Sequence, residues 1–182
     1  MKICAFTGHR PRRLPFECNT SDTRYIQLKT ALRDLSIGKI ESENVVKFIS
    51  GMALGVDMLA AEVVLELQSV YSEICLEAAI PCADQPVKWC VPQKERYHNI
   101  LARCTQRTVL QKEYTVDCME KRNQYMIDHA DFLIAVWDGK PSGTGKTVRY
   151  AMSKGVAVMV LDPQTMQVKA MKSKYEKSGR TV

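Results

Sequence analysis

Apolar runs of strand length alternate with amphipathic helical patterns along most of the chain. Several of the runs, among them FLIAV at residues 132–136, are continuously apolar, which is typical of strands buried on both faces. Alternation of this kind requires a parallel sheet with helices packed against it. We therefore predict an α/β fold, a Rossmann-like, doubly wound, mainly parallel sheet with helices on both faces.

The boundaries of the expected elements follow from the apolar spacing and from glycine and proline positions. Strands are expected over residues 2–8, 45–50, 73–81, 106–111, 131–138 and 156–162. Helices are expected over residues 21–37, 58–70, 93–104, 117–130 and 144–155. Ser21 or Asp22 is the expected cap of the first helix, because both residue types accept a hydrogen bond from backbone N–H groups at a helix start.

The chain of 182 residues has the length of one domain and contains no linker rich in Gly, Ser or Pro. We expect a single Rossmann-like domain over residues 1–165 and a basic C-terminal tail over residues 166–182, for which a short helix is one option. No apolar stretch is long enough to span a membrane. The short run ICAF is followed by TGHRPRR, which argues against a secretion signal and favours the cytoplasm.

The cysteines and the net charge limit which metal sites and which kinds of ligand are expected. The seven cysteines include no C-x-x-C pair and no Cys/His cluster at zinc spacing, so we expect reduced thiols and no metal site. The net charge of +6 is compatible with a phosphate-bearing ligand and is too small to indicate nucleic acid by itself.

Polar and glycine residues gather where the expected strands end. In doubly wound sheets, ligands bind beyond the carboxyl ends of the strands. Glycine there lets the backbone approach a ligand closely, and a helix N-terminus offers N–H groups to an anion. The candidate ligand-binding residues are Thr7, Gly8, Arg10, Gly51, Gly55, Asp57, Asp84, Asp138, Gly143 and Thr144.

Each polar type in this set has a chemical role. Thr7 and Thr144 can donate hydroxyl hydrogen bonds, and Arg10 can hold an anion with two parallel hydrogen bonds. Asp57 or Asp84 can accept from ribose hydroxyls. A purely structural role stays open for Asp57, because Asp is a preferred helix cap.

Three further residues keep two interpretations each. His9 either orients its loop or faces solvent. Arg122 belongs to the site or pairs with a nearby carboxylate. Lys146 helps to neutralise a phosphate or is simply solvated.

The stretch GKPSGTGKT at residues 139–147 ends like a triphosphate-binding loop. That loop needs G-x-x-x-x-G-K-[ST], which would place its first glycine at position 140. The residue there is Lys140, and Gly139 is one position too early. We therefore interpret the stretch as a Gly143-Thr144 turn at a helix N-terminus.

Five segments together resemble the YpsA-like family of the SLOG superfamily, which also contains Smf/DprA-type and LOG-type proteins. They are TGHRP, SGMALGVDMLAAE (50–62), IPCADQPVKW (80–89), KRNQYMIDHADFLIAVWDG (121–139) and SGTGKTVRYA (142–151), in the family's order from residue 3 to about 162. The resemblance implies a Rossmann-like fold and a pocket for a nucleotide or a nucleotide-derived ligand such as an ADP-ribose-like molecule. It also implies a link to cell division, as in some bacteria, or to stress signalling.

The sequence departs from the pattern of the family that it resembles at two points in the Gly-Thr loop. Ser142 stands where related proteins often carry a glycine, so the loop is expected to have a different shape. LOG-type enzymes follow their Gly-Thr with a glutamate that serves glycosidic cleavage, whereas Gly145, Lys146 and Thr147 follow here. This argues against LOG-type hydrolysis, unless Asp57 or Glu62 supplies the acid or base.

The favoured function is therefore a module that senses a nucleotide-like small molecule and passes the bound state to a protein partner. The ligand that would act as its cofactor is left unidentified, and a homo-oligomer is compatible with the sequence. One alternative is a nucleotide-processing hydrolase of the phosphoribohydrolase type. Another is a DprA-like single-stranded DNA binder, which is less favoured because aromatic residues make up only 7% of the chain.

Overall fold

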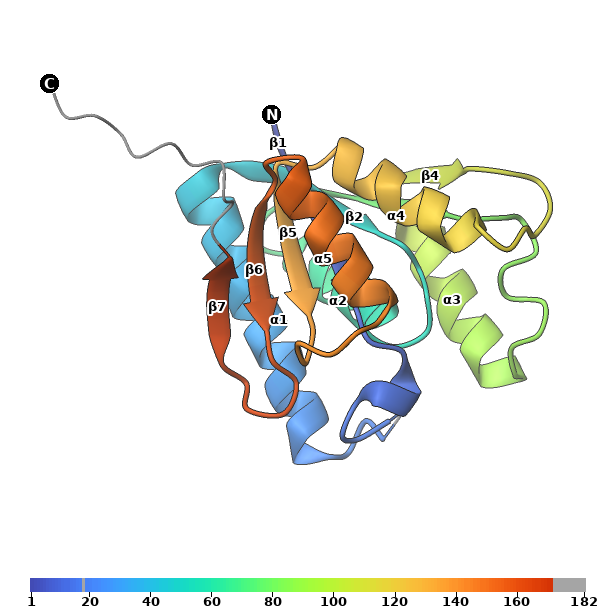
Figure 1. The fold of residues 1–182 in the computed structure, drawn as a ribbon, viewed down its shortest axis with the longest axis horizontal. Helices are drawn as coiled ribbons and strands as arrows, with labels where there is room; N and C mark the ends of the chain where they lie inside the picture. The colour runs from blue at the N-terminus through green and yellow to red at the C-terminus, as the bar shows by residue number, and fades with distance from the viewer. Residues whose placement is uncertain (18, 172–182) are drawn as a thin grey trace, which may run out of the picture.

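The computed structural model describes residues 1–17 and 19–171, which form one seven-stranded sheet flanked by helices (Figure 1). The strand order is β4-β3-β2-β1-β5-β6-β7, and neighbours run parallel except for β6 and β7, which are antiparallel. The strands are β1 (Lys2–Gly8), β2 (Val45–Ser50), β3 (Cys75–Ile80), β4 (Gln106–Val109), β5 (Phe132–Val136), β6 (Ala157–Leu161) and β7 (Val168–Met171).

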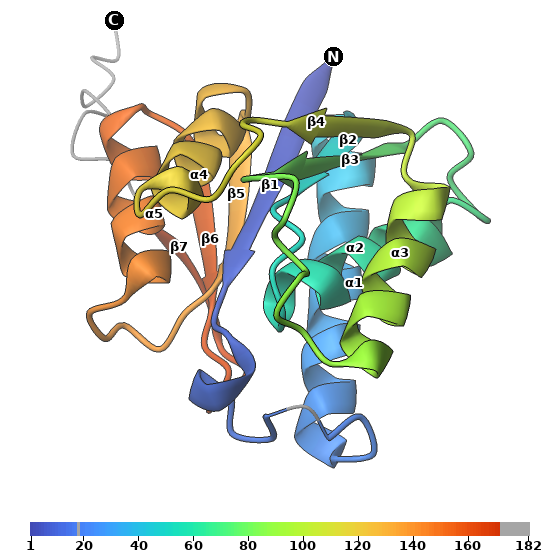
Figure 2. The same ribbon diagram turned by 90° about the vertical axis from the view of Figure 1, so that its right-hand side faces the viewer.

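Helices cover both faces of this sheet, as Figure 2 shows with the sheet seen nearly edge-on. One face carries α1 (Thr23–Glu43), α2 (Val56–Leu67) and α3 (Val91–Arg103), and the other carries α4 (Cys118–Asp128) and α5 (Gly143–Ser153). A 3-10 turn, η1 (Pro11–Arg13), follows β1. The prediction of a doubly wound, mainly parallel α/β fold is confirmed.

Each face of the sheet has its own apolar core. On the α1–α3 face, Phe6 of β1 stacks on Phe48 of β2 with ring centroids 5.6 Å apart, and both are fully buried. On the other face, Met126 of α4 and Val148 of α5 pack with Leu133 of β5. Strands that are buried on both faces account for the continuous apolar runs in the sequence.

Helix α1 extends beyond its expected end at residue 37 and reaches Glu43. Asp22 caps its start, accepting a hydrogen bond from the Arg24 backbone N–H at 2.8 Å. Gly38 does not end the helix, because Ile40 continues the buried face and contributes to the core. The chain turns at Asn44, which adopts the left-handed conformation with φ 57°.

The segment after β6 adds a strand. Asp162 begins a tight turn by accepting a hydrogen bond from the Gln164 backbone N–H at 2.7 Å, and β7 then pairs with the open edge of β6. The optional helix in the tail is therefore wrong for residues 168–171, because pairing to a sheet edge overrides the local preference. The rest of the predicted basic tail, residues 172–182, lies outside the described residues. Among the helices described, none has the length and apolar character needed to cross a membrane.

Candidate functional site

The strand order creates a crevice between β1 and β5. From β1 the chain moves outward through β2, β3 and β4, and α4 then brings it back to β5 on the other side of β1. Connections that leave adjacent strands in opposite directions open a space at the carboxyl ends, where doubly wound proteins bind their ligands. A cleft of about 200 Å³ lies at this point. We call it the strand-end cleft.

Six of the expected site residues line the strand-end cleft. They come from the end of β1, the start of α2 and the start of α5: Thr7, Gly8, Arg10, Asp57, Gly143 and Thr144. Sequence segments separated by more than 80 residues therefore meet at one point, because β1 and β5 are neighbours in the sheet.

The Gly-Thr turn is shaped by Ser142. Its backbone is extended, with φ −168° and ψ 171°, a conformation open to any residue, so serine replaces glycine here without strain. The Ser142 hydroxyl accepts a hydrogen bond from the Gly145 backbone N–H at 3.0 Å and caps α5. The first N–H groups of α5 are thereby held at the edge of the cleft, where they suit an anion.

The other four expected residues lie outside the lining. Gly51 carries the Arg122 guanidinium directly against its backbone, so a side chain there would collide with it. Gly55 has φ 99° and packs on the His9 carbonyl, which makes it a turn residue. Asp138 contacts the ring of His9, which lines the cleft. Asp84 is exposed beyond β3, and β2 separates β3 from β1 by about 10 Å in total.

Basic side chains give the cleft a positive wall. Among the described residues, the Arg10 guanidinium makes one hydrogen-bond contact, a weak one to the Met119 sulfur at 3.9 Å. Arg13 donates to the Pro141 carbonyl at 3.0 Å and lies 3.8 Å from the Asp138 carboxylate. Arg10 therefore keeps most of its donors available for a ligand.

A buried ion pair lies at the back of the cleft. Arg122 of α4 donates to the Gly51 carbonyl, and its Nη1 is 3.6 Å from Asp57 Oδ2. Asp57 Oδ2 also accepts a long hydrogen bond of 3.4 Å from the Ala53 backbone N–H. Burial raises the pKa of Asp57 and lowers the pKa of Arg122, although each charge counteracts part of the other's shift. Asp57 is thus a carboxylate with few donors around it.

His9 connects the loops that follow β1 and β5. Its Nε2 lies 2.9 Å from Asp138 Oδ1, and the Asp138 backbone N–H approaches the same nitrogen at 3.2 Å. Burial lowers the pKa of His9 more strongly than Asp138 raises it. Burial acts to raise the pKa of Asp138, but hydrogen bonds from the Lys140 backbone N–H and from His9 outweigh it, and the net pKa is lowered. His9 therefore orients its loop, and it is buried rather than solvent-facing.

A chain of hydrogen bonds joins the two sides of the cleft. The Arg122 Nε donates to Asn123 Oδ1 at 2.8 Å, and Asn123 Nδ2 donates to the Thr147 hydroxyl at 2.9 Å. Thr147 in turn donates to the Gly143 carbonyl at 3.1 Å. The start of α5 is thereby tied to the Gly51 loop through α4.

Several lining residues were left open or missed by sequence reasoning. Arg122 does pair with a carboxylate, that of Asp57, and it also lines the cleft. Arg13 and Met119 were not singled out. The stretch RPRR was a usable signal for Arg13, whereas no local pattern indicates that Met119 of α4 reaches the end of β1.

A doubly wound, mainly parallel sheet with a cleft at its switch point defines a Rossmann-like α/β domain. Comparison with known proteins then gives the family: the YpsA model, described as the YspA SLOG family, matches residues 4–171, and the chain belongs to this family.

Two curated relatives come from Bacillus subtilis strain 168. The chain is 32% identical over 138 residues to the "Uncharacterized SPbeta prophage-derived protein YoqJ", covering 69% of this chain and 81% of that protein. It is 29% identical over 148 residues to the "UPF0398 protein YpsA", covering 80% and 81% respectively.

Solved structures show the same fold at lower identity. DNA processing protein A from Helicobacter pylori, whose description concerns a single-stranded DNA binding mode, superposes with TM-score 0.58 at 20% identity, covering 90% of this chain and 69% of that one. The structure of TM1055 superposes with TM-score 0.53 at 14% identity, covering 87% and 72%. At these identities the likeness concerns the fold.

Proposed function

We propose that the protein binds a phosphate-bearing, nucleotide-derived ligand, such as an ADP-ribose-like molecule, in the strand-end cleft and signals the bound state to a protein partner. One observation carries the proposal: the Arg10 guanidinium and the start of α5 face the same cleft at the switch point of the sheet. An arginine with unused donors and a helix N-terminus together suit a phosphate group.

The remaining lining groups fit the sugar and the phosphate. Thr7 and Thr144 line the cleft together with Gly143, and their hydroxyls can donate to phosphate oxygens. Asp57 can accept from a ribose hydroxyl, because the hydrogen bond that its carboxylate already accepts is long. The His9–Asp138 contact holds the surrounding loops in place, so the cleft is preorganised for its ligand.

Hydrolysis has weaker support than binding. Glycosidic cleavage commonly uses two carboxyl groups on either side of the bond. Glu62, one of the two candidates, is engaged by Arg96 through two hydrogen bonds of 2.6 Å and does not line the cleft. Asp57 alone remains, and it already faces Arg122. We therefore favour binding without turnover, and we treat single-stranded DNA binding as a competing proposal that rests on fold likeness.

Calorimetric titration tests the proposal with a matched pair of variants. The probes are pyrophosphate, AMP and ADP-ribose at low ionic strength, where exposed charges are least screened. Arg10→Ala should weaken binding of each probe by about tenfold or more, because a charge-assisted hydrogen bond is lost. Arg12→Ala removes the same charge two residues away, outside the cleft lining, and should leave affinity unchanged.

Two results would contradict the proposal. Equal losses in Arg10→Ala and Arg12→Ala would mean that the probes respond to net charge and not to the cleft. Tight binding of a single-stranded oligonucleotide with a steep salt dependence, and no binding of the small probes, would favour the nucleic-acid alternative.

A further inference from the structure

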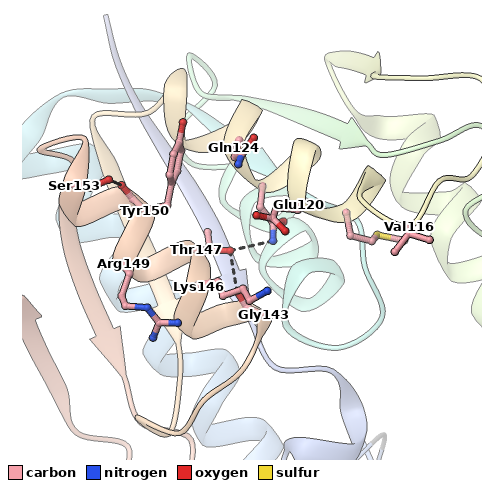
Figure 3. A pocket seen from close by; sticks show the side chains of 11 residues that line it. Val116, Glu120, Gln124, Gly143, Lys146, Thr147, Arg149, Tyr150 and Ser153 are labelled. Carbon is pink, nitrogen blue, oxygen red and sulfur yellow. Dashed lines mark hydrogen bonds between the residues drawn. The ribbon is translucent and has the colours of Figure 1, made fainter.

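A second hollow continues from the strand-end cleft along α4 and α5. It has a volume of about 540 Å³, and Figure 3 shows it as a groove between the two helices. Met119, Asn123 and Gly143 line both this α4–α5 groove and the strand-end cleft. The two hollows are therefore adjoining parts of one site.

Size argues that a ligand occupies both parts. Binding sites for small molecules and cofactors have volumes of roughly 300 to 1,000 Å³. The strand-end cleft, at about 200 Å³, is smaller than this and suits a phosphate with part of a sugar. The α4–α5 groove lies within the range and has room for the remaining, larger part of the molecule.

Two polar side chains on the α4 side of the groove could form hydrogen bonds with a ligand. Glu120 and Gln124 are one helical turn apart, and Figure 3 shows them on the side of α4 that faces Thr147 and Tyr150 of α5. Neither side chain has a hydrogen-bond or ion-pair partner within residues 1–17 and 19–171. Asn123, by contrast, is already hydrogen-bonded to Arg122 and Thr147, which holds its side chain in place.

The α5 side supplies a flat surface. Tyr150 donates its hydroxyl hydrogen bond to Asp128 Oδ1 at 2.9 Å, which fixes the position of its ring. Met119 adds a polarisable apolar surface where groove and cleft meet. An aromatic face with nearby carboxylate and amide groups suits a nucleobase, whose ring faces are apolar and whose edges carry donors and acceptors.

We propose that the α4–α5 groove binds the nucleobase of a ligand whose phosphate lies in the strand-end cleft, with Glu120 accepting from an exocyclic amine and Gln124 bonding to the same edge of an aminopurine. This inference rests on the proposed function and narrows it to purine nucleotides. Sugar phosphates fill the cleft alone and bind more weakly.

Titration calorimetry with AMP, IMP and ribose 5-phosphate tests the inference. Wild-type protein should bind AMP about tenfold more tightly than ribose 5-phosphate, with IMP weaker than AMP because it lacks the exocyclic amine. The double variant Glu120→Ala/Gln124→Ala should lose most of the AMP advantage and keep its affinity for ribose 5-phosphate. Glu113→Ala, an exposed residue of the preceding loop that does not line the groove, is the matched control.

The outcomes separate the two levels of the proposal. Equal binding of AMP and ribose 5-phosphate by the wild type, or an unchanged AMP advantage in the double variant, would overturn the groove inference and leave the cleft intact. Loss of affinity for all three probes in Arg10→Ala supports the cleft independently. Absence of binding by every probe to the wild type would remove the proposed function, and the inference with it.

Discussion

Two buried carboxylates, Glu77 in β3 and Asp57 in α2, are treated very differently by their surroundings. Glu77 is 1% exposed and receives three short contacts, from the Lys47 ammonium at 2.6 Å and from the Thr108 and Tyr125 hydroxyls at 2.6 and 2.7 Å. Asp57 is 5% exposed, and its carboxylate has Arg122 at 3.6 Å and a backbone N–H at 3.4 Å. The Glu77 carboxylate therefore has a full set of hydrogen-bond partners, and the Asp57 carboxylate does not.

This difference separates a structural group from a candidate functional one. Burial acts to raise the pKa of Glu77, but its hydrogen bonds from Lys47, Thr108 and Tyr125 outweigh burial and lower the pKa. At Asp57 burial prevails and the pKa is raised. A buried charge without full hydrogen bonding is costly to keep, and under the proposed function a ligand hydroxyl would complete the set of partners of Asp57.

The largest expected effect is on stability at Glu77. Glu77→Gln removes the charge opposite Lys47 and turns an amide toward three donors, so unfolding free energy should fall by about 3 kcal/mol. Urea denaturation followed by circular dichroism measures the loss. The control is Glu73→Gln, an exposed residue just before β3, which should change stability by less than about 0.5 kcal/mol. Similar values for both variants would show that the Glu77 cluster is not stabilising.

A smaller stability effect is expected at Asp57, together with a change in binding. Asp57→Asn should cost about 1 kcal/mol, because Arg122 keeps the Gly51 carbonyl and Asn123 as acceptors. Removing a negative charge from the cleft should also tighten pyrophosphate binding by about threefold. Titration calorimetry checks this, with Glu77→Gln as the comparison that leaves affinity unchanged. Weaker pyrophosphate binding in Asp57→Asn would contradict the placement of the phosphate.

The smallest effect is in the pH dependence of stability, where the two carboxylates act with opposite sign. The folded-state pKa of Glu77 lies below its unfolded value, so its stabilisation is present above about pH 4.3 and is lost as pH falls through the folded pKa. The folded-state pKa of Asp57 lies above its unfolded value of about 3.9, so the folded state holds that proton more tightly and gains stability as pH falls.

The free energy of unfolding of the two variants is compared by urea denaturation at pH values from about 3 to 7, a range in which carboxyl groups titrate. Glu77→Gln should lose stability less steeply than the wild type in acid, and Asp57→Asn more steeply. If the free energy of unfolding fell equally steeply with decreasing pH in both variants, the opposite roles of Glu77 and Asp57 would be refuted.

The sequence was most informative where local pattern and tertiary role coincide. The strand at residues 132–136 and the cap at Asp22 were predictable because apolar continuity and capping chemistry are local properties. The boundary at residue 37 was not, because the burial of Ile40 against the sheet continues the helix past Gly38. The partners of Glu77 come from three separate elements, and no spacing in the sequence connects them.

By itself the sequence determined the parallel α/β architecture and the set of glycine and polar residues at the strand ends. Tertiary structure decided which of those residues share a cleft. Strand order made β1 and β5 neighbours, and it left Asp84 beyond β3, outside the cleft. The path of α4 across the sheet brought Arg122 under the Gly51 loop and opened the groove beside α5. The physical reason is that strand pairing and helix crossing are set by packing between distant segments, whereas periodicity reports only on each segment's own burial.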